Sequence, residues 1–179
     1  MIKVNTPSVE IKEPKALQIT NFLEESNHIE QEWSQEAQDD SIRAWNYISG
    51  FMELSLENIL NTHKMLMKTR DCPDSWKGKL RNGPVWVGGR EGLQHGQIKE
   101  TLTRWIERVN RVVALGNTTG IDLNDLIREQ HISYEYIHPF FDGNGRTGRI
   151  FYNWTRNNCG LPIEIIKYAE RGRYYDWFR

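Results

Sequence analysis

Three things are scarce in this chain of 179 residues: cysteine, long apolar runs and net charge. Its two cysteines, Cys72 and Cys159, form neither a CxxC pair nor a metal-ligand spacing, which excludes a disulfide framework and indicates free thiols in a reducing compartment. No stretch approaches the ~18 apolar residues of a membrane span, and the N-terminus lacks the apolar core of a signal peptide. A formal net charge of −1 gives no general attraction to nucleic acid or anionic lipid.

These absences predict a cytoplasmic protein that binds neither nucleic acid nor membrane, although secretion into a host cell by a non-classical route would leave no trace in the sequence. Hydrophobic residues make up 38% of the chain and charged residues 26%, an ordinary globular composition. The length fits a single compact domain, with seven tryptophans to fill its core. Self-association into a homo-oligomer stays open.

Apolar residues recur at helical spacing along most of the chain, with turn residues between the segments. The clearest case runs from Ile98 to Val113 and is stopped by Gly116. After a loose lead-in over residues 1–14, we expect helices over Lys15–Glu25, Ser26–Gln35, 40–68, 98–115, Ile121–Ile137 and Arg146–Asn158, with one or two short helices at the end. Within the third of these ranges, one apolar stripe is formed by Trp45, Ile48 and Met52, and a second is formed by Leu56, Ile59, Leu60, His63 and Met67.

Residues 78–90 differ from their surroundings and give the best strand pattern in the chain. Asn82-Gly83-Pro84 breaks the segment and Gly88-Gly89 closes it; its apolar residues are Leu80, Val85, Trp86 and Val87. This predicts a β-hairpin, with a plain loop as the alternative. The predicted fold class is all-α, with a single hairpin inserted.

The segment with the most chemistry is His138-Pro139-Phe140-Phe141-Asp142-Gly143-Asn144-Gly145-Arg146-Thr147-Gly148-Arg149. Its glycines allow successive N–H groups to point into one concavity, which the N-terminus of the next helix also faces. Arg146 and Arg149 lie on neighbouring positions of one helix face. Together these groups suit a polyphosphate.

Two further side chains complete that segment. Asp142 is a hard oxygen ligand for Mg²⁺, and His138 can accept a proton near neutral pH. Each part also has an ordinary interpretation: a histidine before proline usually ends a helix, Asp-Gly-Asn-Gly is usually a surface turn, and paired arginines usually face solvent. Their co-occurrence within twelve residues favours a functional site.

The segment matches the active-site pattern of the Fic (filamentation induced by cAMP) family, H-x-F-x-(D/E)-G-N-G-R-x-x-R, at every defined position, and the chain resembles that family over roughly residues 40–179. Three further segments resemble elements of the family. The helix that contains His131 looks like the helix that precedes the motif, and the 78–90 segment looks like the flap hairpin. The Tyr174-Tyr175 end looks like the closing helices. The resemblance implies a Fic fold, with a catalytic core over 40–179 and an N-terminal extension over 1–39.

The resemblance also implies a protein adenylyltransferase, which moves AMP from ATP to a serine, threonine or tyrosine hydroxyl of a target protein. His138 would deprotonate that hydroxyl, Asp142 would hold Mg²⁺ on the α- and β-phosphates, and Phe140 would anchor the loop. Arg146 would neutralise the leaving pyrophosphate and Arg149 would meet the γ-phosphate. The other nucleotide-binding residues would be Gly143, Asn144 and Gly145. The target would dock as an added strand on the flap, at Leu80, Val85, Trp86 and Val87.

An inhibitory motif of the family, (S/T)-x-x-x-E-(G/N), resembles Ser26-Asn27-His28-Ile29-Glu30, although Gln31 replaces the glycine or asparagine. Glu30 would pair with Arg149 and withhold it from the γ-phosphate. The alternative is a solvated glutamate on a surface helix, and a looser match occurs at Thr20 and Glu24.

Other functions stay open beside this one. Fic-type proteins can transfer UMP, phosphocholine or phosphate instead, or remove AMP; the intact Gly143-Asn144-Gly145 favours nucleotidyl transfer. Hydrolysis at a metal held by His131, His138 and Asp142 is disfavoured, because two helical turns separate the histidines. A catalytically silent interaction module would usually lack the histidine or an arginine, and neither is missing.

Overall fold

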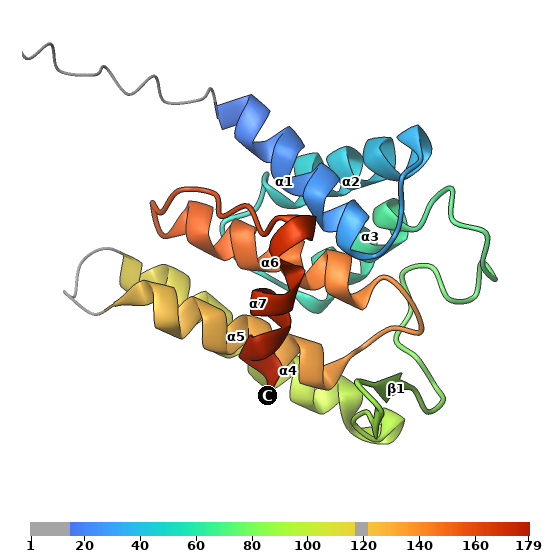
Figure 1. Cartoon of the computed structure of the whole chain (residues 1–179). Helices are drawn as coiled ribbons and strands as arrows, with labels where there is room; N and C mark the ends of the chain where they lie inside the picture. The colour runs from blue at the N-terminus through green and yellow to red at the C-terminus, as the bar shows by residue number, and fades with distance from the viewer. Residues whose placement is uncertain (1–14, 117–121) are drawn as a thin grey trace, which may run out of the picture.

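The computed structural model describes residues 15–116 and 122–179, and the predicted lead-in over residues 1–14 lies outside them. The described ranges form seven α-helices and a two-stranded hairpin (Figure 1), which confirms the predicted class. The helices are α1 Lys15–Ile29, α2 Gln35–Ile48, α3 Leu56–Leu66, α4 Ile98–Leu115, α5 Leu123–Ile137, α6 Asn144–Asn158 and α7 Arg171–Tyr175. The strands are β1 Trp86–Val87 and β2 Arg90–Glu91, and short 3₁₀ helices are η1 His95–Gln97, η3 Tyr168–Glu170 and η4 Asp176–Phe178.

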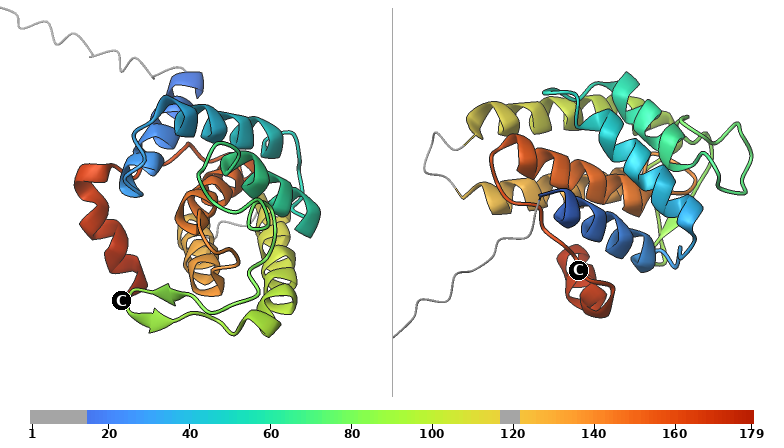
Figure 2. Two further views of the ribbon diagram at one scale, coloured as in Figure 1. Left: turned by 90° about the vertical axis from the view of Figure 1, so that its right-hand side faces the viewer. Right: turned by 90° about the horizontal axis from the view of Figure 1, so that it is seen from above.

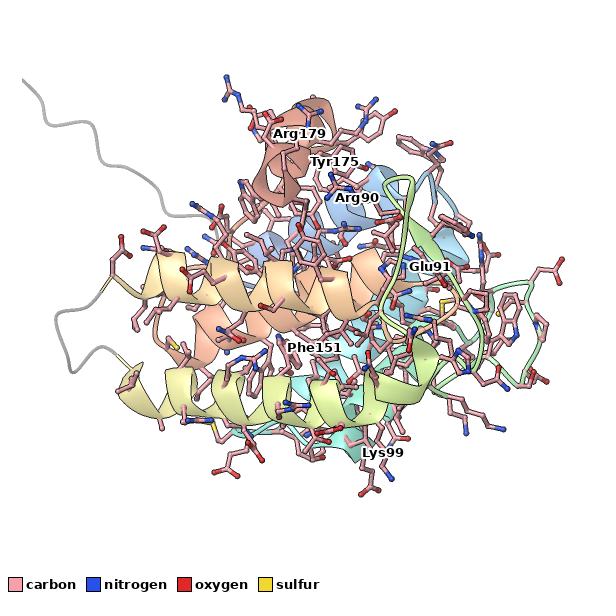
Figure 3. All side chains as sticks on the ribbon, turned by 90° about the horizontal axis from the view of Figure 1, so that it is seen from below. Arg90, Glu91, Lys99, Phe151, Tyr175 and Arg179 are labelled. Carbon is pink, nitrogen blue, oxygen red and sulfur yellow. The ribbon has the colours of Figure 1, made fainter. Side chains whose placement is uncertain are left out.

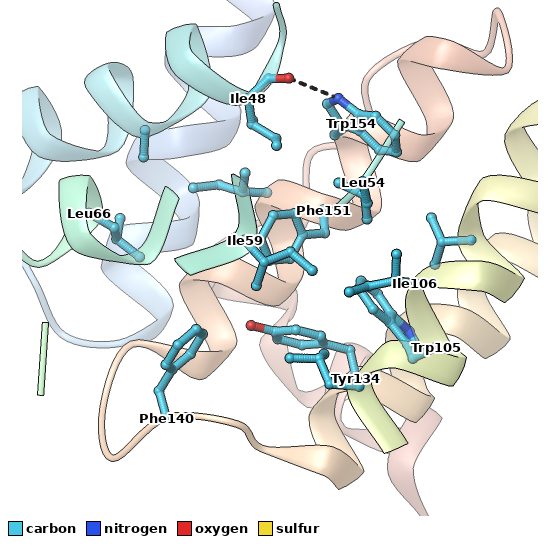
Figure 4. Close-up of a cluster of buried hydrophobic side chains, with 14 of the residues drawn as sticks. Ile48, Leu54, Ile59, Leu66, Trp105, Ile106, Tyr134, Phe140, Phe151 and Trp154 are labelled. Carbon is cyan, nitrogen blue, oxygen red and sulfur yellow. Dashed lines mark hydrogen bonds between the residues drawn. The ribbon is translucent and has the colours of Figure 1, made fainter. Parts of the chain in front are cut away.

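Helix α6 runs through the middle of the bundle, with α1, α3, α4 and α5 packed around it (Figure 2). Its apolar residues Ile150, Phe151 and Trp154 are buried, as its periodicity predicted. Phe151 packs edge-on against Tyr134 of α5, with 5.5 Å between ring centroids, and the indole N–H of Trp154 donates to the Ile48 carbonyl at 3.0 Å (Figure 4). The central helix is thus fixed against α5 and against the end of α2.

The helix predicted over residues 40–68 is two helices, α2 and α3, so that prediction was wrong. Ser55 begins α3 with a capping box: its side chain accepts from the Asn58 N–H at 3.2 Å, and the Asn58 side chain accepts from the Ser55 N–H at 2.8 Å. This local hydrogen bonding starts a new helix inside a continuous apolar pattern. Met52 falls in the connection and is 67% exposed, whereas Trp45 and Ile48 are buried as predicted.

The first helix also differs from its prediction, because α1 continues through Ser26 without the expected break. It ends in a Schellman motif, in which the Glu32 N–H donates to the Asn27 carbonyl and the Gln31 N–H to the His28 carbonyl, both at 3.0 Å. This motif needs one left-handed residue, and Gln31 supplies it with φ 60°. Glycine takes that conformation at no steric cost, so glutamine at this position is a strained choice.

The predicted hairpin is present but shorter than residues 78–90. The antiparallel strands β1 and β2 are joined by Gly88 and Gly89, whose φ values of 56° and 79° are those that a tight hairpin turn needs. Leu80 and Val85 precede the strands, and Leu80 packs against the core. The flap strands proper therefore start at Trp86, which is 71% exposed.

The remaining helix boundaries agree closely with the sequence pattern. Helix α4 ends before Gly116 and α5 follows the Asp122 cap, both as predicted. Helix α6 begins at Asn144, two residues earlier than predicted, because Gly143 already takes the left-handed capping conformation with φ 75°. The predicted start of α5 at Ile121 lies outside the described residues. Among the helices of residues 15–116 and 122–179, none has the length and apolar character to cross a membrane.

Replacing Gln31 with glycine should stabilise the protein, because glycine removes the steric cost of the left-handed conformation at the end of α1. We expect the free energy of unfolding, measured by urea denaturation, to rise by about 0.5 to 1 kcal/mol. Equal stability of the two proteins would show that the strain relieved in the folded state does not exceed the conformational entropy that glycine adds to the unfolded chain.

Helix α6 supplies the matched control for that experiment. Gly160 holds the same left-handed position with φ 76°, and the Leu161 N–H donates to the Arg156 carbonyl at 2.8 Å in the same motif. Gly160→Gln should therefore lower the free energy of unfolding, the opposite of the change at Gln31.

Candidate active site

The loop between α5 and α6 carries the candidate base, His138, at its first position. His138 ends α5 in a left-handed conformation (φ 47°, ψ 62°), so its side chain leaves the helix where Pro139 prevents continuation. Its Nδ1 lies 3.2 Å from the Glu135 carbonyl, which can only accept, so Nδ1 carries the hydrogen and Nε2 keeps its lone pair. Burial lowers the pKa of His138, which favours the neutral imidazole that a general base needs.

A buried guanidinium that the sequence analysis missed holds this turn in place. Arg81 donates from Nε to the His138 carbonyl at 2.7 Å and from Nη1 to the Gly83 carbonyl at 2.7 Å. Its other terminal nitrogen donates to the Leu93 carbonyl at 2.5 Å. One side chain therefore joins the end of α5 to both sides of the hairpin. Nothing in the local sequence marks Arg81, because its partners lie far along the chain.

The side chain of Asn144 closes the loop on itself. Its Oδ1 accepts from the Phe140 N–H and its Nδ2 donates to the Phe140 carbonyl, both at 2.9 Å. Phe140 is fully buried, as the resemblance implied for an anchor. The backbone N–H groups of Asn144 and Gly145 start α6 at this point, so they face the space at the positive end of the helix dipole.

Asp142 lies at the edge of the loop, with its side chain 38% exposed. Its Oδ1 accepts from the Gly143 N–H at 2.6 Å, and its Oδ2 lies 3.3 Å from Nε of Arg70, which also pairs with Glu32. Within the described part of the chain, no three His, Cys, Asp or Glu side chains gather as a metal site. A single carboxylate still fits Mg²⁺, which proteins often hold by one or two carboxylates together with substrate phosphates.

Arg149 is buried and bound to the N-terminal helix. Its Nη2 donates to the Glu30 carboxylate at 2.8 Å, and its Nε donates to the Ser26 hydroxyl at 2.8 Å. Burial alone would lower the pKa of Arg149, but Tyr174 and Glu30 outweigh it and hold that pKa above its ordinary value. The Glu30 carboxylate also lies over Gly145, where an added Cβ would come within 2.2 Å of it. The ion pair expected from the sequence is therefore present, and its carboxylate covers the glycine at the helix start.

Arg146 and Arg149, on neighbouring positions of one helix face, line two different cavities in this structure. Arg149 lines a cavity of about 740 Å³ with residues of the hairpin and the C-terminal segment, including Gly145, Val87, Arg90, Tyr174 and Tyr175. Figure 3 shows this side, where Arg90, Tyr175 and Arg179 approach one another. Arg146 lines a separate cavity of about 260 Å³ with Arg70 and Thr69, and its Nη2 lies 3.5 Å from the Met67 sulfur. Three residues turn a helix by about 300°, which leaves the two side chains about 60° apart around α6, and the helices packed on either side direct them into different gaps.

His131 belongs to a different part of the interior from His138. Its Nε2 lies 2.9 Å from the Tyr174 hydroxyl, which also lies 3.3 Å from Nη1 of Arg149. The hydroxyl oxygen accepts from Arg149, which can only donate, and its contact with His131 is a second hydrogen bond. Burial, with Arg149 nearby, lowers the pKa of His131 to about 3. The contacts give His131 a role in holding the C-terminal segment and lend no support to a metal site shared with His138 and Asp142.

Glu135 is a second residue that sequence reasoning missed. Its carboxyl lies in the large cavity beside Arg149, with Oε2 4.0 Å from Nδ1 of His138, and its buried Oε1 has no hydrogen-bond partner. Burial raises the pKa of Glu135 to about 8, so this side chain is largely a neutral acid at pH 7. On a helical pattern it resembles any other charged residue, and no local spacing distinguishes it.

The chain belongs to the Fic/DOC family, because residues 53–155 match the model of that family. It is 28% identical over 128 residues to the protein adenylyltransferase Fic of Drosophila ananassae, an alignment that covers 72% of this chain and 24% of the relative. It is 28% identical over 123 residues to the protein adenylyltransferase fic-1 of Caenorhabditis elegans, covering 69% of this chain and 23% of the relative. The chain thus spans about a quarter of the length of these curated relatives.

Solved structures share the fold. A Fic domain containing signaling protein from Bacteroides thetaiotaomicron superposes with a TM-score of 0.73 at 19% identity, covering 90% of this chain and 70% of that one. A fragment of Fic-1 from C. elegans gives 0.75 at 18% identity, over 94% of this chain and 58% of that one. The BepC protein of Bartonella tribocorum, solved with bound AMPPNP, gives 0.53 at 16% identity, over 75% of this chain and 69% of that one.

The pH dependence of stability should report on Glu135. Because its pKa in the folded protein, about 8, lies above its ordinary value of 4.5, its contribution to stability is fully present below pH ~4.5 and is lost as the pH rises through 8. Glu135→Gln removes that loss, so the variant should gain stability relative to the native chain between pH 5 and pH 8 in urea titrations. Glu129→Gln, an exposed change on the same helix, should keep the native profile. A constant difference across this range would show that Glu135 ionises normally.

Proposed function

We propose that this chain is a protein adenylyltransferase, which transfers AMP from ATP to a serine, threonine or tyrosine hydroxyl of a target protein. The observation that carries the proposal is one loop that presents a neutral histidine with a free Nε2 beside the glycine-rich N-terminus of α6. A base and an anion-binding helix end are the two groups that phosphoryl chemistry on a hydroxyl requires. The family membership and the names of the relatives support the same activity.

In the proposed reaction the target hydroxyl oxygen bonds to the α-phosphorus of ATP, and the bond from that phosphorus to the bridging oxygen of the β-phosphate breaks. The hydroxyl proton passes to Nε2 of His138, and pyrophosphate leaves. The N–H groups at the start of α6 and the guanidinium groups of Arg146 and Arg149 bind the phosphates. Asp142 would hold Mg²⁺, whose charge, when it is bound, offsets the negative charge of the phosphate oxygens.

The hairpin is the proposed docking place for the target. Its strands β1 and β2 are short and mostly exposed, and Val87 and Arg90 line the same cavity as Arg149. An extended target segment added beside the hairpin would carry its hydroxyl toward His138, whose carbonyl is tied to the hairpin through Arg81. A second copy of the chain stays open as a further partner.

We also propose that the N-terminal helix holds the enzyme off. Arg149 makes three hydrogen bonds to α1 and its end, two to Ser26 and one to Glu30. A guanidinium committed in this way is withheld from a γ-phosphate, and the Glu30 carboxylate occupies the space over Gly145. ATP would then bind only in a pose that does not react.

His138→Ala should abolish transfer while nucleotide binding survives, because the base is separate from the phosphate-binding groups. The loss of a general base costs on the order of 10²-fold or more in rate. Transfer is measured by mass spectrometry after incubation with ATP and Mg²⁺, as an adenylate adduct on the chain itself, and affinity by calorimetry. The mass of the adduct also separates AMP transfer from phosphate transfer, and an active alanine variant would remove His138 from the mechanism.

Glu30→Gly should raise self-adenylylation by at least about tenfold, since it frees Arg149 and empties the space over Gly145. Ser26→Ala should act in the same direction but less, because it removes one hydrogen bond only. Arg149→Ala should not activate, since it deletes the proposed phosphate ligand as well.

Glu24→Gly is the matched control for this series, because Glu24 is an exposed glutamate on the same helix with the looser Thr20 match. It should behave like the native chain. Native-like activity of Glu30→Gly would mean that α1 does not restrain the enzyme.

A further inference from the structure

We propose that His63 is a positioning residue for the loop that binds the nucleotide, and that it acts by holding the Asp142 carbonyl. His63 lies on α3 and is buried, outside the motif His138–Arg149. Its Nε2 lies 3.0 Å from the Asp142 carbonyl oxygen, and its Nδ1 accepts from the Gly78 N–H at 2.9 Å. The inference rests on the proposed function, since it concerns how that site keeps its shape.

The two contacts fix which nitrogen of His63 carries the hydrogen. A backbone N–H can only donate, so Nδ1 must be the unprotonated nitrogen, and a carbonyl can only accept, so Nε2 must carry the hydrogen. The neutral ring therefore accepts from the Gly78 N–H and donates to the Asp142 carbonyl of the catalytic loop. A side chain that only filled space would need neither nitrogen at these positions.

The packing around the ring leaves it little freedom. The Phe140 ring stacks on it at 3.7 Å between centroids with 9° between planes. A Cβ added at Gly143 would lie 2.8 Å from the Met67 sulfur and 3.4 Å from Nε2 of His63. The imidazole therefore contacts the loop at Phe140, Asp142 and Gly143. These residues precede the start of α6, where the phosphates are proposed to bind.

The Gly78 N–H, which donates to Nδ1 of His63, is held in place as closely as the ring. Gly78 has φ 68°, and a Cβ there would come within 2.8 Å of the Leu60 carbonyl and of the Lys64 Cβ. Only glycine can bring its N–H this close to α3, and the hydrogen bond to Nδ1 holds the ring plane against rotation. The Gly78 contact orients His63, and His63 in turn orients the loop.

Two substitutions separate the two nitrogens. In His63→Gln, the amide nitrogen lies near the Nε2 position and can donate to the Asp142 carbonyl. In His63→Asn, the amide oxygen lies near the Nδ1 position, so it can accept from the Gly78 N–H but the contact with Asp142 is lost. If His63 acts through the Asp142 carbonyl, His63→Gln should behave nearly like the native chain and His63→Asn should not. If the side chain only stabilises the fold, both variants should fail together or neither should.

The first measurement needs no nucleotide. Amide hydrogen exchange of Phe140, Gly143 and Thr147, whose N–H groups donate within the loop, should in the nucleotide-free protein be about tenfold faster in His63→Asn and native-like in His63→Gln, as the loss of one buried hydrogen bond implies. Imidazole ¹⁵N chemical shifts of the native chain should show the Nε2–H tautomer. Equal exchange in both variants, or the opposite tautomer, overturns the proposal, and the tautomer test holds even where a variant does not fold.

The second measurement is ATP affinity by calorimetry, with and without Mg²⁺. His63→Asn should bind ATP about three- to tenfold more weakly and His63→Gln within about twofold of the native chain, in both conditions. Unchanged affinity in a well-folded His63→Asn would overturn the proposal. A native chain that binds no ATP would overturn the proposed function instead, while the exchange and tautomer results would still decide the role of His63.

Discussion

A buried guanidinium cannot lose its charge, and the arrangement of this protein around α6 depends on how the charge of Arg149 is met. Its nitrogens are satisfied by Ser26 and Glu30 from α1 and by Tyr174 from the C-terminal segment. An unpaired charge at that depth would cost several kcal/mol. Two segments at opposite ends of the chain are therefore held against one helix by the same side chain, and residues of both segments and of the hairpin line the large cavity.

Short-range patterns allowed much of this architecture to be predicted. Apolar periodicity predicted α4, α5 and α6, and the paired glycines predicted the tight turn of the hairpin. The errors lie where a local hydrogen bond outweighs the apolar pattern, as at Ser55, whose capping box divides one predicted helix into two. At Ser26 the error was the reverse, because a polar residue continued α1 by turning toward Arg149.

The candidate site divides in the same way. The motif from His138 to Arg149 is contiguous, so its chemistry could be predicted from the sequence. The groups that hold it, Arg81 and His63, lie 57 and 79 residues from the carbonyls of His138 and Asp142 that they contact. No spacing rule reaches so far, and a buried arginine bound only to carbonyls has no local pattern at all. The separation of Arg146 from Arg149 was equally invisible, because it depends on which helices lie on either side of α6.

Arg70 gives the end of α1 a second connection to the catalytic loop. Its guanidinium is shared between Glu32, the last residue of the Schellman motif, and Asp142. Two groups that share one partner are thermodynamically linked: a cation that displaced Arg70 from Asp142 would change the free energy of the contact at Glu32, and release of Glu32 would change the affinity at Asp142 by the same factor. Cation binding at Asp142 and attachment of the end of α1 through Glu32 are therefore coupled, so a change in either one shifts the other.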